Sequence, residues 1–190
     1  MSQGFEAAFL LGMKAEVGEF FNPNLPVHET GIIVTKSDKM HTGYVNDPDD
    51  AGGETKYGIA KNFNPDVDIK NLTLQSAKKI YESKYWISSL APKLPYPLNV
   101  VYFDAAINNG ATPAAKFIQR ALGVLDDGQI GPKTLAAIAA CTDLKALCVK
   151  SLEKRDAFFR AIVAAKPKQA KYLNGWLNRT ARVRKWLQQA

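Results

Sequence analysis

The segment Tyr44–Ile59 constrains the fold most, because no other stretch has so many turn-forming residues, carboxylates and hydroxyl groups together. It contains the pairs Asp47-Pro48 and Gly52-Gly53, both of which favour turns. Apolar residues are sparse before Tyr57, so the segment cannot build a core by itself. It is therefore either an ordinary solvated loop or a site held by the scaffold around it. Acid and hydroxyl groups are placed on these turns by Asp49, Asp50, Glu54, Thr55 and Tyr57.

The rest of the chain predicts mainly helices, because apolar side chains recur every three or four residues in separate stretches. Hydrophobic residues make up 46% of the 190 residues, enough for a sizeable core in one compact domain. We expect Ser2 to cap the first helix, Thr73 the second, and Thr112 and Thr142 two later ones. The predicted helices cover residues 2–18, 73–86, 98–109, 112–122, 135–140, 142–165 and 174–187.

One stretch predicts strands instead. Residues Gly31–Thr35 are rich in β-branched side chains, Lys36–Lys39 resembles a turn, and Met40–Val45 can return as a partner strand. We therefore expect a small β-hairpin at about 31–45, beside the site and within a mainly α fold. His28 and His41 flank it without the spacing of a metal site, so we expect both at the surface.

Composition narrows the classes of function. Cys141 and Cys148 are too few for a disulfide framework and have no His nearby, so we expect two small buried residues and neither a metal nor a cofactor. The apolar runs are short for a bilayer span and Met1–Gly4 has no basic segment before an apolar one, so we expect neither a transmembrane helix nor a cleaved signal peptide. A net charge of +7 favours polyanionic partners such as nucleic acid, an anionic membrane or the polymers of a cell envelope.

Several single residues have two interpretations. Glu16 and Glu19 fall at the C-terminal end of the first predicted helix, where the helix dipole disfavours a negative charge. Each is either a solvated surface residue or a carboxylic acid suited to donate a proton. Asp104 and Asn108 lie four residues apart on one helix face, where buried hydrogen bonding competes with a functional role. Trp86 is expected as a core anchor more than as a platform for sugar.

Five separated motifs together resemble the phage endolysins of glycoside hydrolase family 108, which are N-acetylmuramidases. The likeness covers Phe5 to about Arg182 and implies a mostly helical, lysozyme-like fold. Residues 1–97 would form a catalytic lobe that includes the hairpin, and residues 98–190 a helical lobe resembling a peptidoglycan-binding module. The motifs are the helix ending in Glu16 and the runs 43–59, 103–110, 127–134 and 175–179.

The resemblance implies the catalytic residues. Glu16 matches the family's essential glutamate, and Asp50 and Thr55 match its Asp-x-Gly-Gly-x-Thr loop. In the family this glutamate runs directly into Gly-Gly-Tyr-Val. Here Val17-Gly18 follows Glu16, and Phe20–Thr42 intervenes before Gly43-Tyr44. Glu19 and Glu29 therefore compete for the role, and we prefer Glu16 because its distance from the start of the helix fits the family.

The implied reaction is hydrolysis of the β-1,4 bond between N-acetylmuramic acid and N-acetylglucosamine, leading to host cell lysis. Glu16 would protonate the leaving oxygen, Asp50 would orient water or stabilise the oxocarbenium-like state, and Thr55 would hold that water. By analogy with phage lysozymes we expect inversion. Aromatic faces stack on sugar rings and amides bind acetamido groups, so the candidate sugar contacts are Tyr44, Tyr57 and Asn108, although the tyrosines can equally fill the core.

The expected partners are peptidoglycan glycan strands and, through the basic C-terminal helix, an anionic envelope surface. We expect Arg179, Arg182, Arg184 and Lys185 to strengthen cell-wall binding at low salt, in a monomer that binds no nucleic acid. We expect the protein to be synthesised in the host cytoplasm and to act on peptidoglycan in the periplasm after its release. The alternatives are a lytic transglycosylase, which would not need Asp50, and a non-catalytic cell-wall-binding virion protein.

Overall fold

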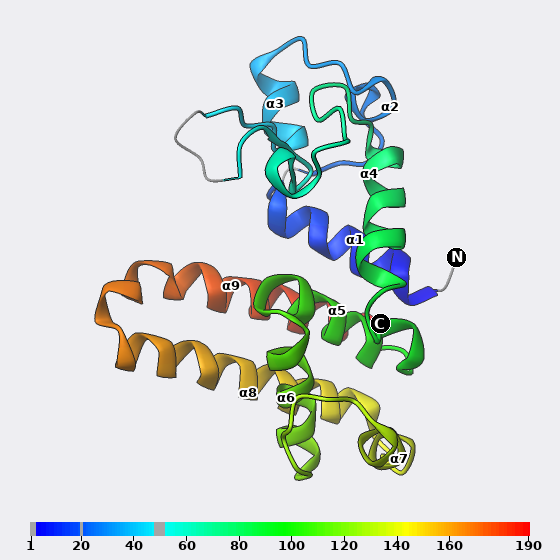
Figure 1. Ribbon diagram of the computed structural model, residues 1–190, viewed down its shortest axis with the longest axis vertical. Coiled ribbons are helices and arrows are strands. Elements are labelled where there is room, and N and C mark those ends of the chain that lie inside the picture. Colours follow the sequence, from blue (N-terminus) through cyan, green and yellow to red (C-terminus); the bar gives the residue numbers. More distant parts are fainter. Residues whose placement is uncertain (1–2, 20, 48–51) are drawn as a thin grey trace. The chain divides into compact units, whose positions relative to one another are not determined.

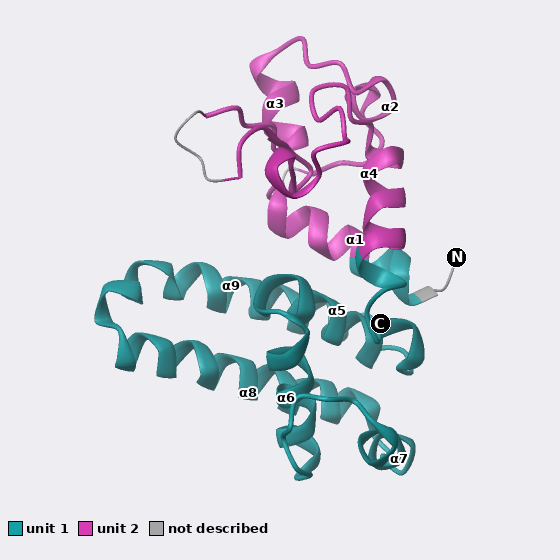
Figure 2. Cartoon of the chain, in the orientation of Figure 1, with its two compact units in different colours: residues 1–8, 85–190 teal, residues 9–84 magenta. Residues whose placement is uncertain are grey.

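The computed structural model describes residues 3–19, 21–47 and 52–190, which are mainly helical (Figure 1). The chain forms two compact units (Figure 2). Unit 2 is Phe9–Lys84, and unit 1 combines Met1–Ala8 with Tyr85–Ala190. The first helix, α1 (Gln3–Glu16), therefore contributes residues to both units. The units divide the chain after residue 84, whereas the predicted lobes divide it after residue 97.

Unit 2 consists of short elements joined by turns. Its only described strands form an antiparallel pair in which Thr55 is paired with Ala60 and Lys56 with Ile59, and Val45 adds a single bridge to Thr55. Phe9 of α1 packs edge-on against Tyr81, with ring centroids 5.6 Å apart. Its elements are the end of α1, α2 (Pro26–Thr30), α3 (Lys36–Thr42), β1 (Thr55–Lys56), β2 (Ile59–Ala60), η1 (Lys61–Phe63), α4 (Leu74–Ile80) and most of η2 (Tyr81–Trp86).

The predicted hairpin at 31–45 is wrong, because α3 occupies its centre. Thr35 and Asp38 form a reciprocal capping box, in which each side chain accepts from the other residue's backbone N–H. This cap starts a helix where the sequence resembles a turn. Ile32 and Val34 are 59% and 80% exposed, so the β-branched residues are not buried as a strand face would be. The small hairpin of the fold instead follows at Thr55–Ala60.

Unit 1 is a helical assembly in which α8 packs against α5, α6 and α9. The two long helices α8 and α9 run antiparallel, side by side (Figure 1). The helix at 98–109 is confirmed with the same bounds, and α9 begins four residues before its prediction. The elements are η3 (Ala91–Lys93), α5 (Leu98–Asn109), α6 (Ala111–Leu122), α7 (Pro132–Ala139), α8 (Leu144–Ala165), η4 (Pro167–Gln169) and α9 (Ala170–Leu187).

Local details of unit 1 refine the predictions. Asp143, and not Thr142, caps α8, with its carboxylate accepting from the backbone N–H of Ala146 at 2.8 Å. Trp86 is a core anchor as expected, buried between Phe5 and Phe103. Both cysteines are free; Cys148 is buried as predicted, whereas Cys141 is half-buried. Across the described residues, none of the helices has the length and apolar character needed to cross a membrane.

Candidate active site

Glu16 is the last residue of α1, and its side chain meets the turn between β1 and β2. A Cβ atom placed on Gly58 would lie 3.0 Å from Cγ of Glu16 and 2.7 Å from the hydroxyl oxygen of Tyr81. Gly58 also has a φ of +72°, which other residues rarely adopt. The contact therefore depends on the missing side chain at position 58. The turn covers the methylene groups of Glu16, but the residue stays exposed to solvent.

The segment 17–42 leaves the end of α1 and returns to it. A Cβ atom on Gly43 would lie 3.5 Å from the carbonyl oxygen of Glu16 and 3.5 Å from Cα of Val17. Thr42, just before it, accepts a hydrogen bond of 2.9 Å from the backbone N–H of Tyr57. The two ends of the inserted segment are thus in contact. In the fold, the end of α1 at Glu16 therefore lies next to Gly43, which Tyr44 follows. Along the chain, 26 residues separate Glu16 from Gly43.

Thr55 begins β1, and Tyr44 is next to Val45, which forms a β-bridge with Thr55. The backbone of Thr55 exchanges two hydrogen bonds with Val45, of 2.9 and 2.8 Å, and its hydroxyl donates to the carbonyl of Gly53 at 3.0 Å. The phenol of Tyr44 donates to Glu54 at 2.8 Å, and this hydrogen bond raises the pKa of Tyr44. Glu16 thus contacts Gly43 and Gly58, while Tyr44 follows the first of these glycines and Thr55 is bridged to Val45. The third predicted catalytic residue, Asp50, lies outside the described residues.

Tyr57 is a core residue, so its predicted sugar contact is wrong. Its side chain has 0% exposure, and its phenol shares a hydrogen bond of 2.8 Å with Nδ1 of His28. Burial raises the pKa of Tyr57 and lowers that of His28. His28 is itself 2% exposed, which corrects the prediction that it lies at the surface. The pattern of the sequence could not show this pairing, because 29 residues separate the two partners.

Lys56 is a structural residue that the sequence did not indicate. It has 0% exposure, and its ammonium group donates to the carbonyl oxygens of Gly31 and Lys70 at 2.5 and 3.0 Å. Burial lowers its pKa to about 8. Lys56 therefore ties β1 to the inserted segment and to the loop before α4. A lysine in a turn-rich loop is usually solvated, so no sequence signal distinguishes this one.

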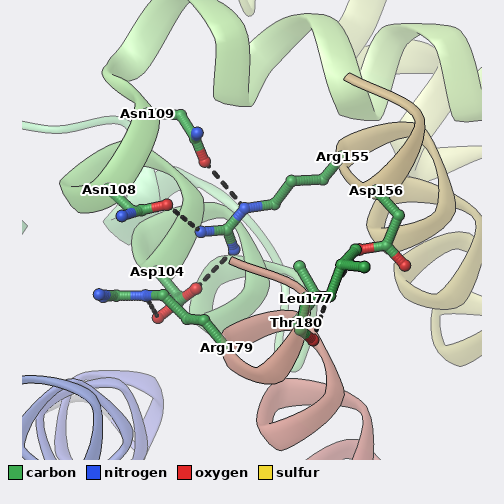
Figure 3. Close-up of polar contacts among 8 residues, drawn as sticks. All are labelled: Asp104, Asn108, Asn109, Arg155, Asp156, Leu177, Arg179 and Thr180. Carbon is green, nitrogen blue, oxygen red and sulfur yellow. Dashed lines mark hydrogen bonds and ion pairs between the residues drawn. The ribbon is translucent and has the colours of Figure 1, made fainter. Parts of the chain in front are cut away.

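Asp104 and Asn108 belong to a buried network in unit 1 (Figure 3). Arg155 donates to Asp104 at 2.6 Å, to Asn108 at 2.9 Å and to Asn109 at 2.8 Å. Arg179 donates to the other carboxylate oxygen of Asp104 at 3.0 Å. Burial opposes ionisation of Asp104, but the two guanidinium charges keep its pKa below the ordinary value. The amide oxygen of Asn108 is thus engaged in structure, which favours the structural interpretation over the predicted sugar contact.

The competing glutamates are also at the surface. Glu19 follows α1 in a turn and Glu29 lies in α2, and both side chains are exposed. The contact with Gly58 distinguishes Glu16. Within residues 3–19, 21–47 and 52–190, no three His, Cys, Asp or Glu side chains are grouped so as to hold a metal ion.

Comparisons with known proteins relate two parts of the chain to protein families. The model of the glycosyl hydrolase 108 family matches residues 36–110, and a model described as a predicted peptidoglycan domain matches residues 113–181. No curated protein matches the chain. Among solved structures, that of SagA from Brucella abortus is similar at 30% identity and a TM-score of 0.59, over 76% of this chain and 84% of SagA.

These matches confirm the mainly helical fold class with a small hairpin and make the chain a glycoside hydrolase directed at peptidoglycan. The family match begins at α3, so Glu16 lies before the matched residues. The two models occur in the order that the sequence motifs predict, and the chain belongs to the glycosyl hydrolase 108 family.

Proposed function

We propose that the protein is an N-acetylmuramidase that hydrolyses the β-1,4 bond between N-acetylmuramic acid and N-acetylglucosamine, with Glu16 as the general acid. The observation that supports this choice is the position of Glu16 against Gly58 and Gly43. The two ends of the inserted segment are in contact, so Glu16 lies next to the start of Gly43-Tyr44-Val45 in the fold. In the family, the glutamate comes directly before Gly-Gly-Tyr-Val in the sequence. Glu16 thus takes the place of the family acid although it lies outside the matched residues.

The reaction needs a proton donor because a glycosidic oxygen is a poor leaving group. Glu16 is exposed beside the turn of the hairpin, so a bound sugar can approach its carboxyl group. Tyr44 is half-buried, with Lys39 5.7 Å from its ring centroid and Glu54 on its hydroxyl, which hold the ring in one orientation. We assign Tyr44 to contact with a sugar ring next to the scissile bond.

Water activation falls to the loop that follows Tyr44. The hydroxyl of Thr55 donates to Gly53, and its oxygen can still accept from a water molecule. We propose that Asp50 completes the set as the ionised carboxylate that orients this water. A separation of roughly 6.5–9.5 Å between the two carboxyl groups would produce inversion, and about 5–5.5 Å retention. We favour inversion.

Mass spectrometry of purified peptidoglycan after digestion tests this assignment. The wild type should release fragments with reducing N-acetylmuramic acid ends. Glu16→Gln should lower the rate by about 10²–10⁴-fold. Glu19→Gln and Glu29→Gln are matched controls and should keep the rate of the wild type.

Other outcomes identify the alternatives. Loss of activity in Glu29→Gln with full activity in Glu16→Gln would move the acid to α2. Anhydro-muramic products, with Asp50→Asn fully active, would mean a lytic transglycosylase. No cleavage by the wild type would leave a protein that binds the cell wall without catalysis.

The biological role rests on the resemblance to phage endolysins. We propose that the enzyme is made in a host cytoplasm and reaches peptidoglycan in the periplasm after a separate protein opens the inner membrane. Expression in bacteria with and without such a membrane-permeabilising protein tests this step. Lysis that needs both proteins, and that Glu16→Gln abolishes, is the expected result.

A further inference from the structure

A pocket of about 520 Å³ lies on unit 1 between α8 and α9, next to the connecting element η4. This volume is in the range of small-ligand sites. It lies within residues 113–181, the part matched by the peptidoglycan domain, and the catalytic proposal does not use it. Its apolar lining comes from Phe158, Ala161, Ile162, Ala165 and Trp176.

Trp176, one of the pocket-lining residues, is held in place by buried neighbours. The indole of Trp176 stacks on Phe159, with ring centroids 5.1 Å apart and an angle of 22° between the planes. Phe159 is 1% exposed, and the guanidinium of Arg155 lies 5.6 Å from its ring centroid. Trp176 is thus linked to the buried network of Figure 3. A pocket with such a supported wall needs little rearrangement to receive a ligand.

Two polar side chains, the cation Lys166 and the amide Gln169, complete the lining. Lys171 follows at the start of α9, where its ammonium group lies 4.9 Å from the ring centroid of Tyr172. Tyr172 is 48% exposed and lies 5.9 Å from Trp176. An apolar lining that includes one cation is complementary to a ligand that carries small apolar groups and a carboxylate.

We propose that this pocket binds the stem peptide of peptidoglycan, with an alanine methyl group against Trp176 and Ala165 and a carboxylate at Lys166. The glycan strand fits less well, because neutral sugars present many hydroxyl groups and Gln169 is the single side-chain amide among the described lining residues. Stem peptides carry both alanine methyl groups and free carboxylates. The inference rests on the proposed function only in taking peptidoglycan as the polymer.

Calorimetric titration of the full-length protein with a free stem pentapeptide tests the inference. Ala165→Phe fills the pocket from an exposed position and should weaken binding about tenfold or more. Ala164→Phe is the matched control: it is also exposed, lies one residue earlier on α8 outside the lining, and should bind like the wild type. Lys166→Gln should weaken binding about threefold and reduce its dependence on salt.

Two further ligands separate the competing occupants. The disaccharide of N-acetylglucosamine and N-acetylmuramic acid without peptide, and vesicles of anionic phospholipid, should bind wild type and Ala165→Phe equally or not at all. Absence of pentapeptide binding, or equal binding by Ala165→Phe, overturns the inference. Disaccharide or vesicle binding that Ala165→Phe abolishes also overturns it, because the pocket would then be a sugar site or a membrane-contacting surface.

Hydrolysis measured in parallel separates this inference from the proposed muramidase. Glu16→Gln should bind the pentapeptide like the wild type and release reducing ends about 10²–10⁴-fold more slowly. If the wild type cleaves peptidoglycan but does not bind the pentapeptide, the inference about the pocket fails alone. If the pentapeptide binds in a pocket-dependent way and no cleavage occurs, the muramidase assignment fails and the peptide site stands.

Discussion

Arg155 in unit 1 and Lys56 in unit 2 are both buried cations, but the protein stabilises them differently. Arg155 is bound by the carboxylate of Asp104 and two amide side chains, at separations of 46 to 51 residues. Lys56 donates to two backbone carbonyl groups instead. The helical unit is thus fixed by side-chain pairs between helices. The unit with the candidate active site depends on backbone geometry, and its glycines decide where Glu16 lies.

The largest expected effect comes from breaking the side-chain network. Arg155→Met leaves Asp104 with one of its two guanidinium partners and removes the donors to Asn108 and Asn109, so it should cost about 3–5 kcal/mol of unfolding free energy. Lys56→Met leaves two carbonyl groups without this donor and should cost less, about 1–3 kcal/mol. Urea unfolding measures both.

Arg160→Met, at an exposed position on the same helix as Arg155, is the control and should have nearly the stability of the wild type. Equal losses at Arg155 and Lys56 would remove the distinction between the two units.

The second effect tests backbone control of the site. Gly58→Ala introduces a Cβ atom too close to Glu16 and Tyr81 and imposes strain at a φ of +72°. Displacing Glu16 by about 1 Å should lower kcat/KM by about 10²-fold. Gly123→Ala is the matched control in unit 1, with the same φ but no atom within 4 Å of the new Cβ. It should cost about 1 kcal/mol of stability and leave activity unchanged. Full activity of Gly58→Ala would show that the turn does not position Glu16.

A third prediction uses pH to compare the two cations. Burial lowers the pKa of Lys56 from 10.5 to about 8, so between these values the folded protein has released a proton that the unfolded chain retains. Unfolding then takes up a proton, and stability should rise with pH across this window. The rise should be absent from Lys56→Met, whereas Arg155→Met should keep it. Urea midpoints measured from pH 7.5 to about 10.5 decide this, and parallel curves for wild type and Lys56→Met would contradict it.

The sequence predicted most of the helical unit because its signals are local. The apolar side chains that indicate α5 and α9 lie within the helices themselves, and Gly110 directly follows α5. The hairpin at 31–45 failed for a related reason. The β-branched run favoured a strand, but the capping box of Thr35 and Asp38 starts a helix there. By composition alone, the residues of this capping box resemble a turn.

The candidate site could be predicted only in part. Motif order indicated Glu16 and Thr55, but the closure of residues 17–42 onto Gly43 requires coordinates. The buried pairs of Tyr57 with His28, and of Lys56 with Gly31, join residues 29 and 25 positions apart and leave no periodic pattern. Composition also does not distinguish the arginines of the C-terminal helix. In the fold, Arg179 forms an ion pair with Asp104 and Arg184 forms one with Asp156.

The smallest effect separates those arginines from Lys185, an exposed cation of the same helix. Arg184 donates to Asp156 at 2.6 Å and Arg179 to Asp104 at 3.0 Å, so Arg179→Gln and Arg184→Gln should act first on stability. Lys185 is exposed, and Lys185→Gln should weaken binding to purified cell wall by only about twofold at low salt. This difference should vanish near 1 M salt, where screening acts within about 3 Å.

Sedimentation of purified cell wall with each variant across a salt series measures this effect, with urea unfolding in parallel. If Arg179→Gln and Arg184→Gln keep their stability and lose wall binding more strongly than Lys185→Gln, these arginines act on the envelope, as composition suggests. If they lose stability and bind the wall normally while folded, their charge is part of the scaffold. In that case the basic residues available to attract an anionic polymer are those at the protein surface, such as Lys185.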